Sequence, residues 1–278
     1  MTARELLEAG RLGEAIAVLG AELKARPTDK GLRVFLFELL CFAGEYDRAG
    51  KQLDAIGRLE TTQTEVQLGV RQYVDLLAAE RSRAAVFAGK ARPRFPLLPP
   101  EGVALHADAL AQLAAGDAAG AGELLKRAEG LHEVVRGSRD GVEFDEVRDA
   151  DDVLAPVVEV LTAAGYFWVP WSQVQYLEVD PPKRLRDLIW APAKLATHDG
   201  QLGEVFLPAL YPGSHTHADE SVKLGRATDW QEFEPGSELR RGLGAKLCLV
   251  GDEAWTVGEL GTLQMARETA DTDAGERA

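Results

Sequence analysis

Cysteine is scarce in this sequence. The 278 residues include two cysteines, Cys41 and Cys248, which lie far apart and have apolar neighbours. Two isolated cysteines among apolar residues are more typical of buried side chains than of a disulfide or a metal pair. We therefore expect two buried, reduced thiols in a cytoplasmic protein.

Long apolar runs are also absent. No stretch approaches the roughly 20 apolar residues that a membrane-spanning helix needs. The first ten residues carry Arg4, Glu5 and Glu8 and lack the apolar segment of a secretory signal. We expect the protein to stay in the cytoplasm, without a membrane partner.

Positive charge is in deficit, and mainly in the second half of the chain. The net charge is −14. Residues 1–136 hold 18 Lys and Arg against 19 Asp and Glu, whereas residues 137–278 hold 13 against 26. Such an acidic surface repels phosphate backbones, which excludes nucleic acid as an expected partner.

Recognisable catalytic motifs are missing as well. Ser214 lacks the glycine setting of a nucleophile elbow, and the glycines of residues 241–246 lack Walker spacing. The carboxylates of residues 143–152 precede an expected helix, where acidic residues are typical of capping. We predict no catalytic residues, no cofactor and no enzymatic activity.

One short string has the composition of a metal site. His215, His217 and Asp219 would share one face of a strand and could supply part of a zinc or iron site. The string follows a Pro-Gly-Ser turn, so we favour a polar turn and predict no metal. The alternative function is a hydrolase or metalloenzyme built in the second half around these residues and Asp229.

Internal repetition dominates the first half. Gly10 and Gly44, Ala15 and Ala49, and Leu19 and Leu53 are each 34 residues apart, which is the tetratricopeptide period. Glycine can end a helix at positive φ, and a small alanine lets the next helix lie close. A third copy begins at Gly116. The pattern predicts helical hairpins over residues 1–136, with a proline-rich connector over 90–100.

The pattern changes near residue 137. Short runs rich in Val, Trp, Tyr and Leu alternate with Pro, Gly and Asp, which is typical of strands and tight turns. We predict one helix over 151–164 and a mainly antiparallel sheet, for which barrel-like closure is one option. Its strands are expected at 166–170, 173–179, 186–190, 203–210, 222–227 and 246–250.

The predicted fold class is thus α+β in two parts. Tetratricopeptide-like hairpins (1–136) precede an acidic α+β domain (137–266), and the small, charged residues 267–278 form a frayed tail.

Tryptophan and arginine recur together in the second half, and both are frequent anchors of protein interfaces. Six motifs follow one another in order over about residues 140–260. They are Asp151-Asp152 with Pro156 and Glu159-Val160; Gly165-Tyr166 with Trp168-Val169-Pro170-Trp171; Pro181-Pro182 with Leu185-Arg186-Asp187 and Trp190; Leu210-Tyr211-Pro212-Gly213-Ser214; Leu224-Gly225-Arg226 with Thr228-Asp229-Trp230; and Val250-Gly251-Asp252-Glu253. In this order they resemble the ImpE family, the TagJ-type accessory proteins of bacterial type VI secretion.

The resemblance implies a cytoplasmic, non-enzymatic adaptor. Such a protein binds the small sheath subunit of the secretion tube through that subunit's N-terminal helix, and it influences sheath assembly or recycling by the associated unfoldase ATPase. The resemblance brings no residue-level binding site.

A binding surface is instead expected from the residues themselves. Stacked hairpins form a concave groove suited to a helix or an extended peptide, unless the connector at Phe95–Pro100 fills it. The first helix of each hairpin and the Trp/Arg motifs supply the candidates. The residues expected to contact the partner are Val34, Glu38, Cys41, His106, Leu110, Trp168, Trp171, Arg186, Trp190, Arg226, Asp229 and Trp230.

Overall fold

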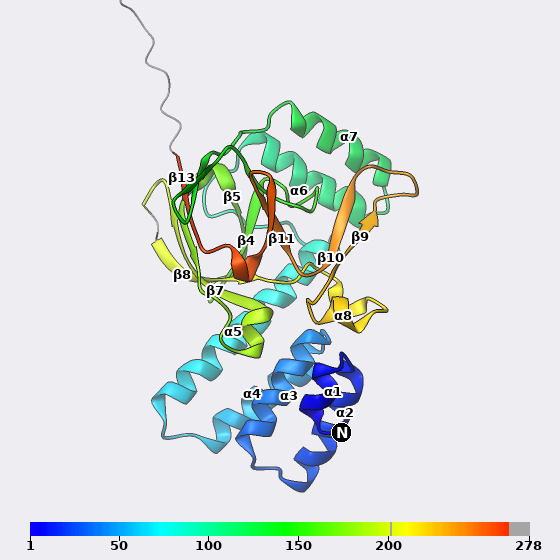
Figure 1. Ribbon diagram of the computed structural model, residues 1–278, viewed down its shortest axis with the longest axis vertical. Helices are drawn as coiled ribbons and strands as arrows, with labels where there is room; N and C mark the ends of the chain where they lie inside the picture. Colours follow the sequence, from blue (N-terminus) through cyan, green and yellow to red (C-terminus); the bar gives the residue numbers. More distant parts are fainter. Residues whose placement is uncertain (201, 267–278) are drawn as a thin grey trace, which may run out of the picture.

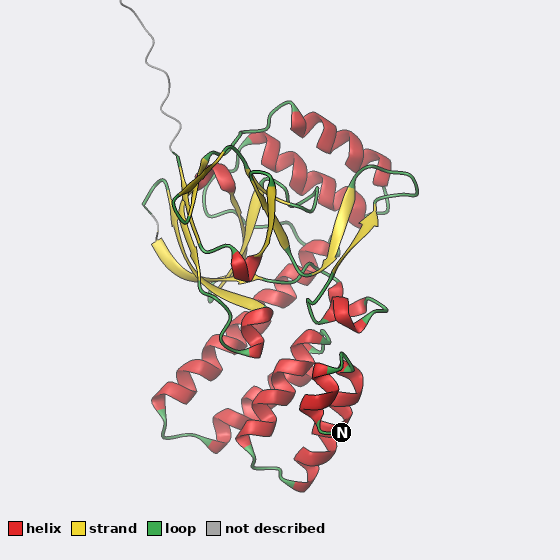
Figure 2. Cartoon of the chain, viewed as in Figure 1, coloured by secondary structure: helices red, strands yellow, loops and turns green. Residues whose placement is uncertain are grey.

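The computed structural model describes residues 1–200 and 202–266, and the tail predicted at 267–278 lies outside this range. Helices make up the first half and strands most of the second, as predicted (Figure 1, Figure 2). The helices are α1 (Ala3–Glu8), α2 (Leu12–Ala25), α3 (Lys30–Phe42), α4 (Tyr46–Leu59), α5 (Thr64–Phe87), α6 (Glu101–Ala114), α7 (Ala118–Glu129) and α8 (Glu220–Lys223).

The predicted hairpin joints are present in α1 to α4. Gly10 and Gly44 end the first helix of each pair at φ +75° and +69°. The alanine that follows each turn, Ala15 or Ala49, has no exposed surface, and Leu19 and Leu53 are buried beside it. Small side chains at these positions let α2 pack on α3 and α3 on α4.

The later helices take a different place in the molecule. The long helix α5 leaves the repeats and packs against the sheet strands β4 and β5. After the connector, α6 and α7 form a hairpin beside the strands, well away from α1 to α4 (Figure 1). The connector itself runs along β5: the carbonyl of Arg94 accepts a hydrogen bond from the amide of Trp168 at 2.9 Å.

An eight-stranded antiparallel sheet organises the second half, in the order β2-β1-β13-β6-β7-β8-β4-β5. Because β2 and β5 are its two ends, the sheet is open and the barrel option is not realised. Its strands are β1 (Gly137–Arg139), β2 (Val142–Phe144), β4 (Val157–Thr162), β5 (Gly165–Pro170), β6 (Val174–Val179), β7 (Trp190–Thr197), β8 (Leu202–Pro208) and β13 (Thr262–Met265).

Two smaller sheets complete the β structure. The remaining strands are β3 (Val147–Asp149), β9 (Thr228–Glu232), β10 (Arg240–Gly244), β11 (Leu247–Val250) and β12 (Glu253–Thr256). Strands β9 and β10 pair with each other, and β11 lies between β12 and β3. The short 3₁₀ helices are η1 (Trp171–Gln173), η2 (Leu185–Leu188), η3 (Ser214–Thr216) and η4 (Val257–Glu259).

The prediction of a helix over 151–164 is wrong. Strand β4 (Val157–Thr162) occupies the centre of this range, and turns precede and follow it. The β-branched run around Glu159 favours a strand, and Pro156 marks its start. The carboxylate of Asp151 does accept a backbone hydrogen bond, from Val153 at 2.9 Å, but it closes a buried turn and does not cap a helix.

Two predicted strands are also wrong. Residues 186–190 lie mostly in η2, because the Asp187 carboxylate accepts hydrogen bonds from the amides of Lys183 and Arg184 and closes a turn. Residues 222–227 contain the end of α8 and a turn at Gly225, where φ is +65°. In both places local side-chain hydrogen bonds or glycine override the strand propensity.

One hydrophobic cluster extends from α1 through α5 to β4, β5 and β7. A second cluster fills the space between the large sheet and the β3–β11–β12 sheet. The boundary predicted at residue 136 stays a prediction, since buried side chains on both sides of it share the first cluster. Among the described residues, no helix is long and apolar enough to cross a membrane.

Candidate functional site

The protein's own second half contacts α3 and α5, on the side of α3 where the groove was expected. Arg186, on η2, reaches across and donates from Nη1 to Oε1 of Glu38 on α3 at 2.8 Å. Its Nε donates to the hydroxyl of Tyr73 on α5 at 2.7 Å, and the guanidinium lies 4.9 Å from the Tyr73 ring centroid. Burial raises the pKa of Glu38 despite the adjacent Arg186.

Trp190 reinforces this contact. Its indole Nε1 donates to Oε1 of Glu80 on α5 at 2.9 Å. Its ring lies 6.2 Å from Phe37 and 6.1 Å from Tyr73, measured between centroids. The predicted connector does not fill the groove, because Phe95 packs edge-on against Trp168 instead.

The second half also completes the ends of the first two helices. The N-cap residue of α2, Arg11, makes no capping hydrogen bond. The Glu220 carboxylate accepts from the amides of Leu12 and Gly13 at 2.7 and 3.1 Å in its place. Arg226 donates to the carbonyls of Leu7 and Glu8 at the end of α1, at 2.8 and 3.0 Å. The Glu220 carboxylate thus lies at the partly positive N-terminal end of α2, and the Arg226 guanidinium lies at the partly negative C-terminal end of α1.

A cluster of buried charges lies where α5 meets the sheet. Glu159 on β4 is 1% exposed and accepts two hydrogen bonds from Arg83 at 2.8 Å. It also accepts from the hydroxyl of Tyr166 and pairs with Lys246, both at 2.5 Å. Burial alone would raise the pKa of Glu159, but the two cations lower it well below its usual range.

The same cluster continues into the β3 region. Lys246 pairs with Asp149 at 2.9 Å, and the Tyr211 hydroxyl donates to the other oxygen of Asp149 at 2.9 Å. Burial raises the pKa of Asp149 to about 6. Asp151 pairs with Arg241 at 2.9 Å. Every charge is matched inside the protein, so this arrangement is suited to holding the two halves in register.

The structure buries most of the residues that were expected to contact a partner. Of these twelve side chains, Arg226 and Asp229 are exposed, while Val34, Arg186 and Trp230 are partly exposed. A side chain with at most 9% of its surface exposed offers little area for contact with a partner in this conformation. The buried candidates are Glu38, Cys41, His106, Leu110, Trp168, Trp171 and Trp190.

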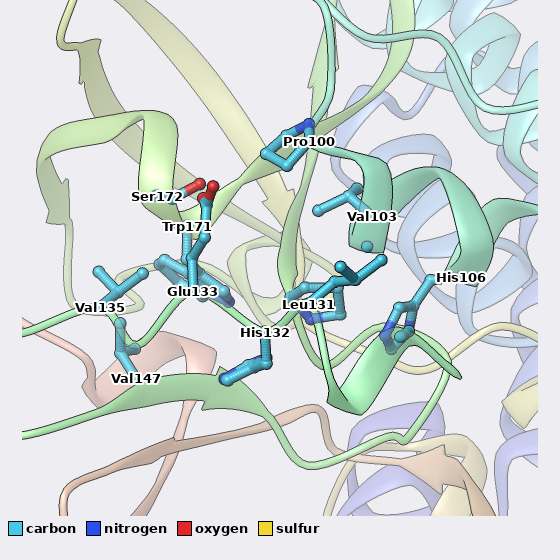
Figure 3. Close-up of a pocket in the computed structure, with 13 residues that line it drawn as sticks. Pro100, Val103, His106, Leu131, His132, Glu133, Val135, Val147, Trp171 and Ser172 are labelled. Atoms are coloured by element: carbon cyan, nitrogen blue, oxygen red, sulfur yellow. The ribbon is translucent and has the colours of Figure 1, made fainter. Parts of the chain in front are cut away.

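His106 and Trp171 come together around a small cavity (Figure 3). Its volume is about 20 Å³, enough for a single water molecule. The Trp171 indole Nε1 has no hydrogen-bond partner among the described residues. His106 Nδ1 lies 3.0 Å from the carbonyl of Val153, and burial lowers the pKa of His106 to about 4.

The His-x-His-x-Asp string forms a turn around η3. His217 Nε2 lies 3.0 Å from Oδ2 of Asp229, and Asp219 caps α8 through the amide of Ser221. His215 packs on Gly44, where a Cβ would overlap its ring. Within residues 1–200 and 202–266, no group of three His, Cys, Asp or Glu side chains is arranged to hold a metal ion.

Two larger hollows adjoin at the junction of the halves, and His215 lines both. The first, of about 270 Å³, lies between α3, α5 and residues 210–215. The second, of about 650 Å³, lies between α2, the α3–α4 turn and α8. We call them together the junction groove. It is lined by residues of both halves.

Sequence reasoning missed three residues that build this junction, Glu80, Glu220 and Lys246. Their partners lie far along the chain, and a single sequence carries no signal for such pairs. The Arg–Trp motifs containing Arg186 and Arg226 were expected either to lock a rigid scaffold or to build a recognition surface, and in the structure both arginines bond other parts of the chain.

Comparisons with known proteins match both halves. A family model described as "ImpE protein" matches residues 141–264, and one described as "Tetratricopeptide repeat" matches residues 6–73. The chain is 36% identical over 230 residues to the "Type VI secretion system accessory component TagJ" of Pseudomonas aeruginosa. This match covers 83% of the chain and 81% of that protein.

A solved structure has the same architecture. The crystal structure of a Vibrio parahaemolyticus protein superposes with a TM-score of 0.86 at 30% sequence identity, covering 96% of this chain and 98% of the other. The helical hairpins and the sheet therefore occur together in both structures. The chain belongs to the ImpE family.

Proposed function

We propose that this protein is a cytoplasmic accessory component of a type VI secretion system that binds the small sheath subunit. The partner is bound through its N-terminal helix, and no reaction is catalysed. The observation that carries the proposal is the 36% identity to TagJ across both halves of the chain. Any effect on the unfoldase ATPase that recycles the sheath is then indirect.

The arrangement of charged residues supports a binding role. Catalytic acids and bases need access to a substrate. Here the strongly perturbed carboxylates, Asp149 and Glu159, are buried and paired with Lys246. The tetratricopeptide-like hairpins support the same role, because repeats of this kind bind helices and extended peptides on their concave side.

A pull-down with the full chain tests the proposal. The bait is this protein, and the prey is the small sheath subunit, either intact or without its N-terminal helix. We expect the intact subunit to be retained and the shortened one to be lost. Equal retention of both would refute the role of the helix, and retention of neither would refute the sheath partner.

A further inference from the structure

A separate hollow lies where the chain passes from the large sheet to the β3–β11–β12 sheet. Its volume is about 630 Å³, and residues of β2 and β12 line it. The amide of Gly251 donates to the carbonyl of Glu146 at 2.8 Å and ties its walls together. We call it the edge hollow, because β2 and β12 are each the last strand of their sheet. It shares no lining residue with the junction groove.

The outer sides of these two strands are open. In the described part of the chain, β2 pairs with β1 alone and β12 with β11 alone. An open strand edge presents backbone amides and carbonyls to an extended segment that approaches it. The borders of the edge hollow therefore suit an extended chain better than a helix.

The floor of the edge hollow is apolar and aromatic. Val142 on β2 is 72% exposed, and it is the cross-strand partner of Arg139 on β1. The Arg139 guanidinium lies 3.5 Å from the ring centroid of Trp255 on β12. The indole Nε1 of Trp255 is buried and meets no hydrogen-bond acceptor within residues 1–200 and 202–266. Apolar side chains and the aliphatic stems of cations both pack well on such a floor.

The rim of the edge hollow is acidic, and its charges are not balanced by the protein. Arg139, the cation in its lining, donates to the carbonyls of Glu259 and Leu260 at 2.7 and 3.0 Å. Carboxylates that lie close together without counter-charges attract cations from outside. Four carboxylates of the lining form no ion pair or hydrogen bond with the rest of the described chain: Glu143, Asp145, Asp252 and Glu253.

These charges decide which molecule fits. A second copy of this chain is excluded, because edge-to-edge pairing would bring Glu143 on β2 or Glu253 on β12 against the carboxylates of the other copy. The phosphates of nucleic acids and anionic lipids are repelled for the same reason. A basic protein segment is attracted.

We propose that the edge hollow is a second protein-binding surface, which docks an extended, basic segment of another protein. The cations of the segment pair with the rim carboxylates, and an apolar side chain between them packs on Val142 and Trp255. Charge complementarity and the open strand edges select this occupant. The surface goes beyond the proposed binding of the sheath subunit, because none of its residues belongs to the repeats.

The test measures binding of a fluorescent peptide to the full-length protein by anisotropy. The peptide is Arg-Ser-Val-Ser-Arg-Ser-Val-Ser-Arg, whose arginines and valines share one face when it is extended. A control peptide with serine in place of valine has the same charge, and we expect it to bind more weakly.

The apolar floor is tested by Val142→Ser. We expect the Kd of the valine peptide to rise about tenfold, as for the loss of an interface anchor. Leu68→Ser, on α5 at a position that is 65% exposed, is the matched control and leaves the Kd unchanged.

The acidic rim is tested by Glu143→Gln combined with Glu253→Gln. We expect about a tenfold weaker complex and a smaller dependence of the Kd on salt. Glu234→Gln combined with Glu238→Gln, both exposed between β9 and β10, makes the same change in net charge outside the hollow. Circular dichroism verifies that each variant is folded.

Each outcome decides the proposal without touching the pull-down with the sheath subunit. Failure of the wild-type chain to bind the valine peptide overturns it. Equal weakening by the two glutamine pairs overturns it too, since the peptide then senses only the net charge. Weakening by the rim pair alone, with no effect of Val142→Ser, means attraction of simple cations and also overturns it. Weakening by both hollow variants and by neither control supports the docking surface.

Discussion

The repeats and the sheet half of this protein are stabilised in different ways. In α1 to α4 the joints are apolar: Ala15 and Ala49 have no exposed surface, and leucines pack beside them. In the sheet half, the buried Lys246 forms ion pairs with two buried carboxylates, those of Glu159 and Asp149. Apolar packing tolerates small changes in geometry, whereas a buried charge needs its partner in place.

This difference shows how the halves are held together. Beside the apolar cluster that the halves share, their polar contacts depend on orientation: Arg186 with Glu38, and Glu220 and Arg226 with the ends of two helices. Polar contacts of this kind fix the angle of the repeats relative to the sheet, and they keep the junction groove in one shape.

The largest expected effect comes from Glu159→Gln. The substitution preserves the shape of the side chain but leaves Arg83 and Lys246 buried without their shared carboxylate. We expect the free energy of unfolding to fall by about 3–5 kcal/mol, measured by urea denaturation. Glu204→Gln, at an exposed position of β8, is the control, with an expected change within about 0.5 kcal/mol. Equal stability of the two variants would mean that the buried charges do not hold the sheet half together.

The matching change in the repeats is Leu53→Ala. Leu53 is 4% exposed at the second hairpin joint, and its truncation leaves a cavity. We expect a loss of about 2–5 kcal/mol in the same assay. Leu59→Ala, on the same helix at a position that is 40% exposed, should cost much less. A similar loss at both positions would contradict the hairpin packing.

A smaller effect is expected at the junction, from Arg186→Met. The variant loses the hydrogen bonds to Glu38 and Tyr73 but retains the length of the side chain. We expect a loss of about 1–3 kcal/mol, with faster hydrogen exchange confined to α3 and the first turns of α5. Lys183→Met, exposed on the adjacent turn, controls for the loss of a positive charge. Unchanged exchange in α3 would show that Arg186 does not hold the two halves together.

The smallest effect concerns pH and His106. Its pKa is lowered to about 4 in the folded protein, so between pH 7 and pH 4 the unfolded chain binds the additional proton. The contribution of neutral His106 to the free energy of unfolding is present above pH 6.5 and is lost as the pH falls toward 4. Its contribution between pH 7 and pH 6 is about 0.7 kcal/mol. His106→Asn, measured by denaturation at both pH values, should reduce the difference by that amount. An identical pH dependence in the variant would contradict a buried, neutral His106.

The sequence predicted the repeats well because their determinants are local. The sequence itself shows the repeat that links Gly10 to Gly44 and Ala15 to Ala49. In the structure the glycines form two turns, and the alanines lie at two close helix contacts. Several strands, such as β5, were equally visible as short aromatic and β-branched runs between turns.

The errors arose where distant residues decide the local structure. Asp149 and Asp151 looked like helix caps, but Lys246 and Arg241 bury them in a turn before β4. Arg186 and Trp190 were candidates for contact with a partner, and in the structure they bond Glu38 and Glu80, which lie 148 and 110 positions away in the chain. Periodicity and composition contain no information on such pairs.

The capping of α1 and α2 has a consequence for biosynthesis. These two helices leave the ribosome before Arg226 and Glu220, which follow 219 and 208 positions after the backbone groups that they satisfy. A nascent chain therefore carries this hairpin with unsatisfied helix ends until residues 220–226 have been synthesised. The hairpin is made long before it is completed, and a chain that ends before residue 220 never completes it.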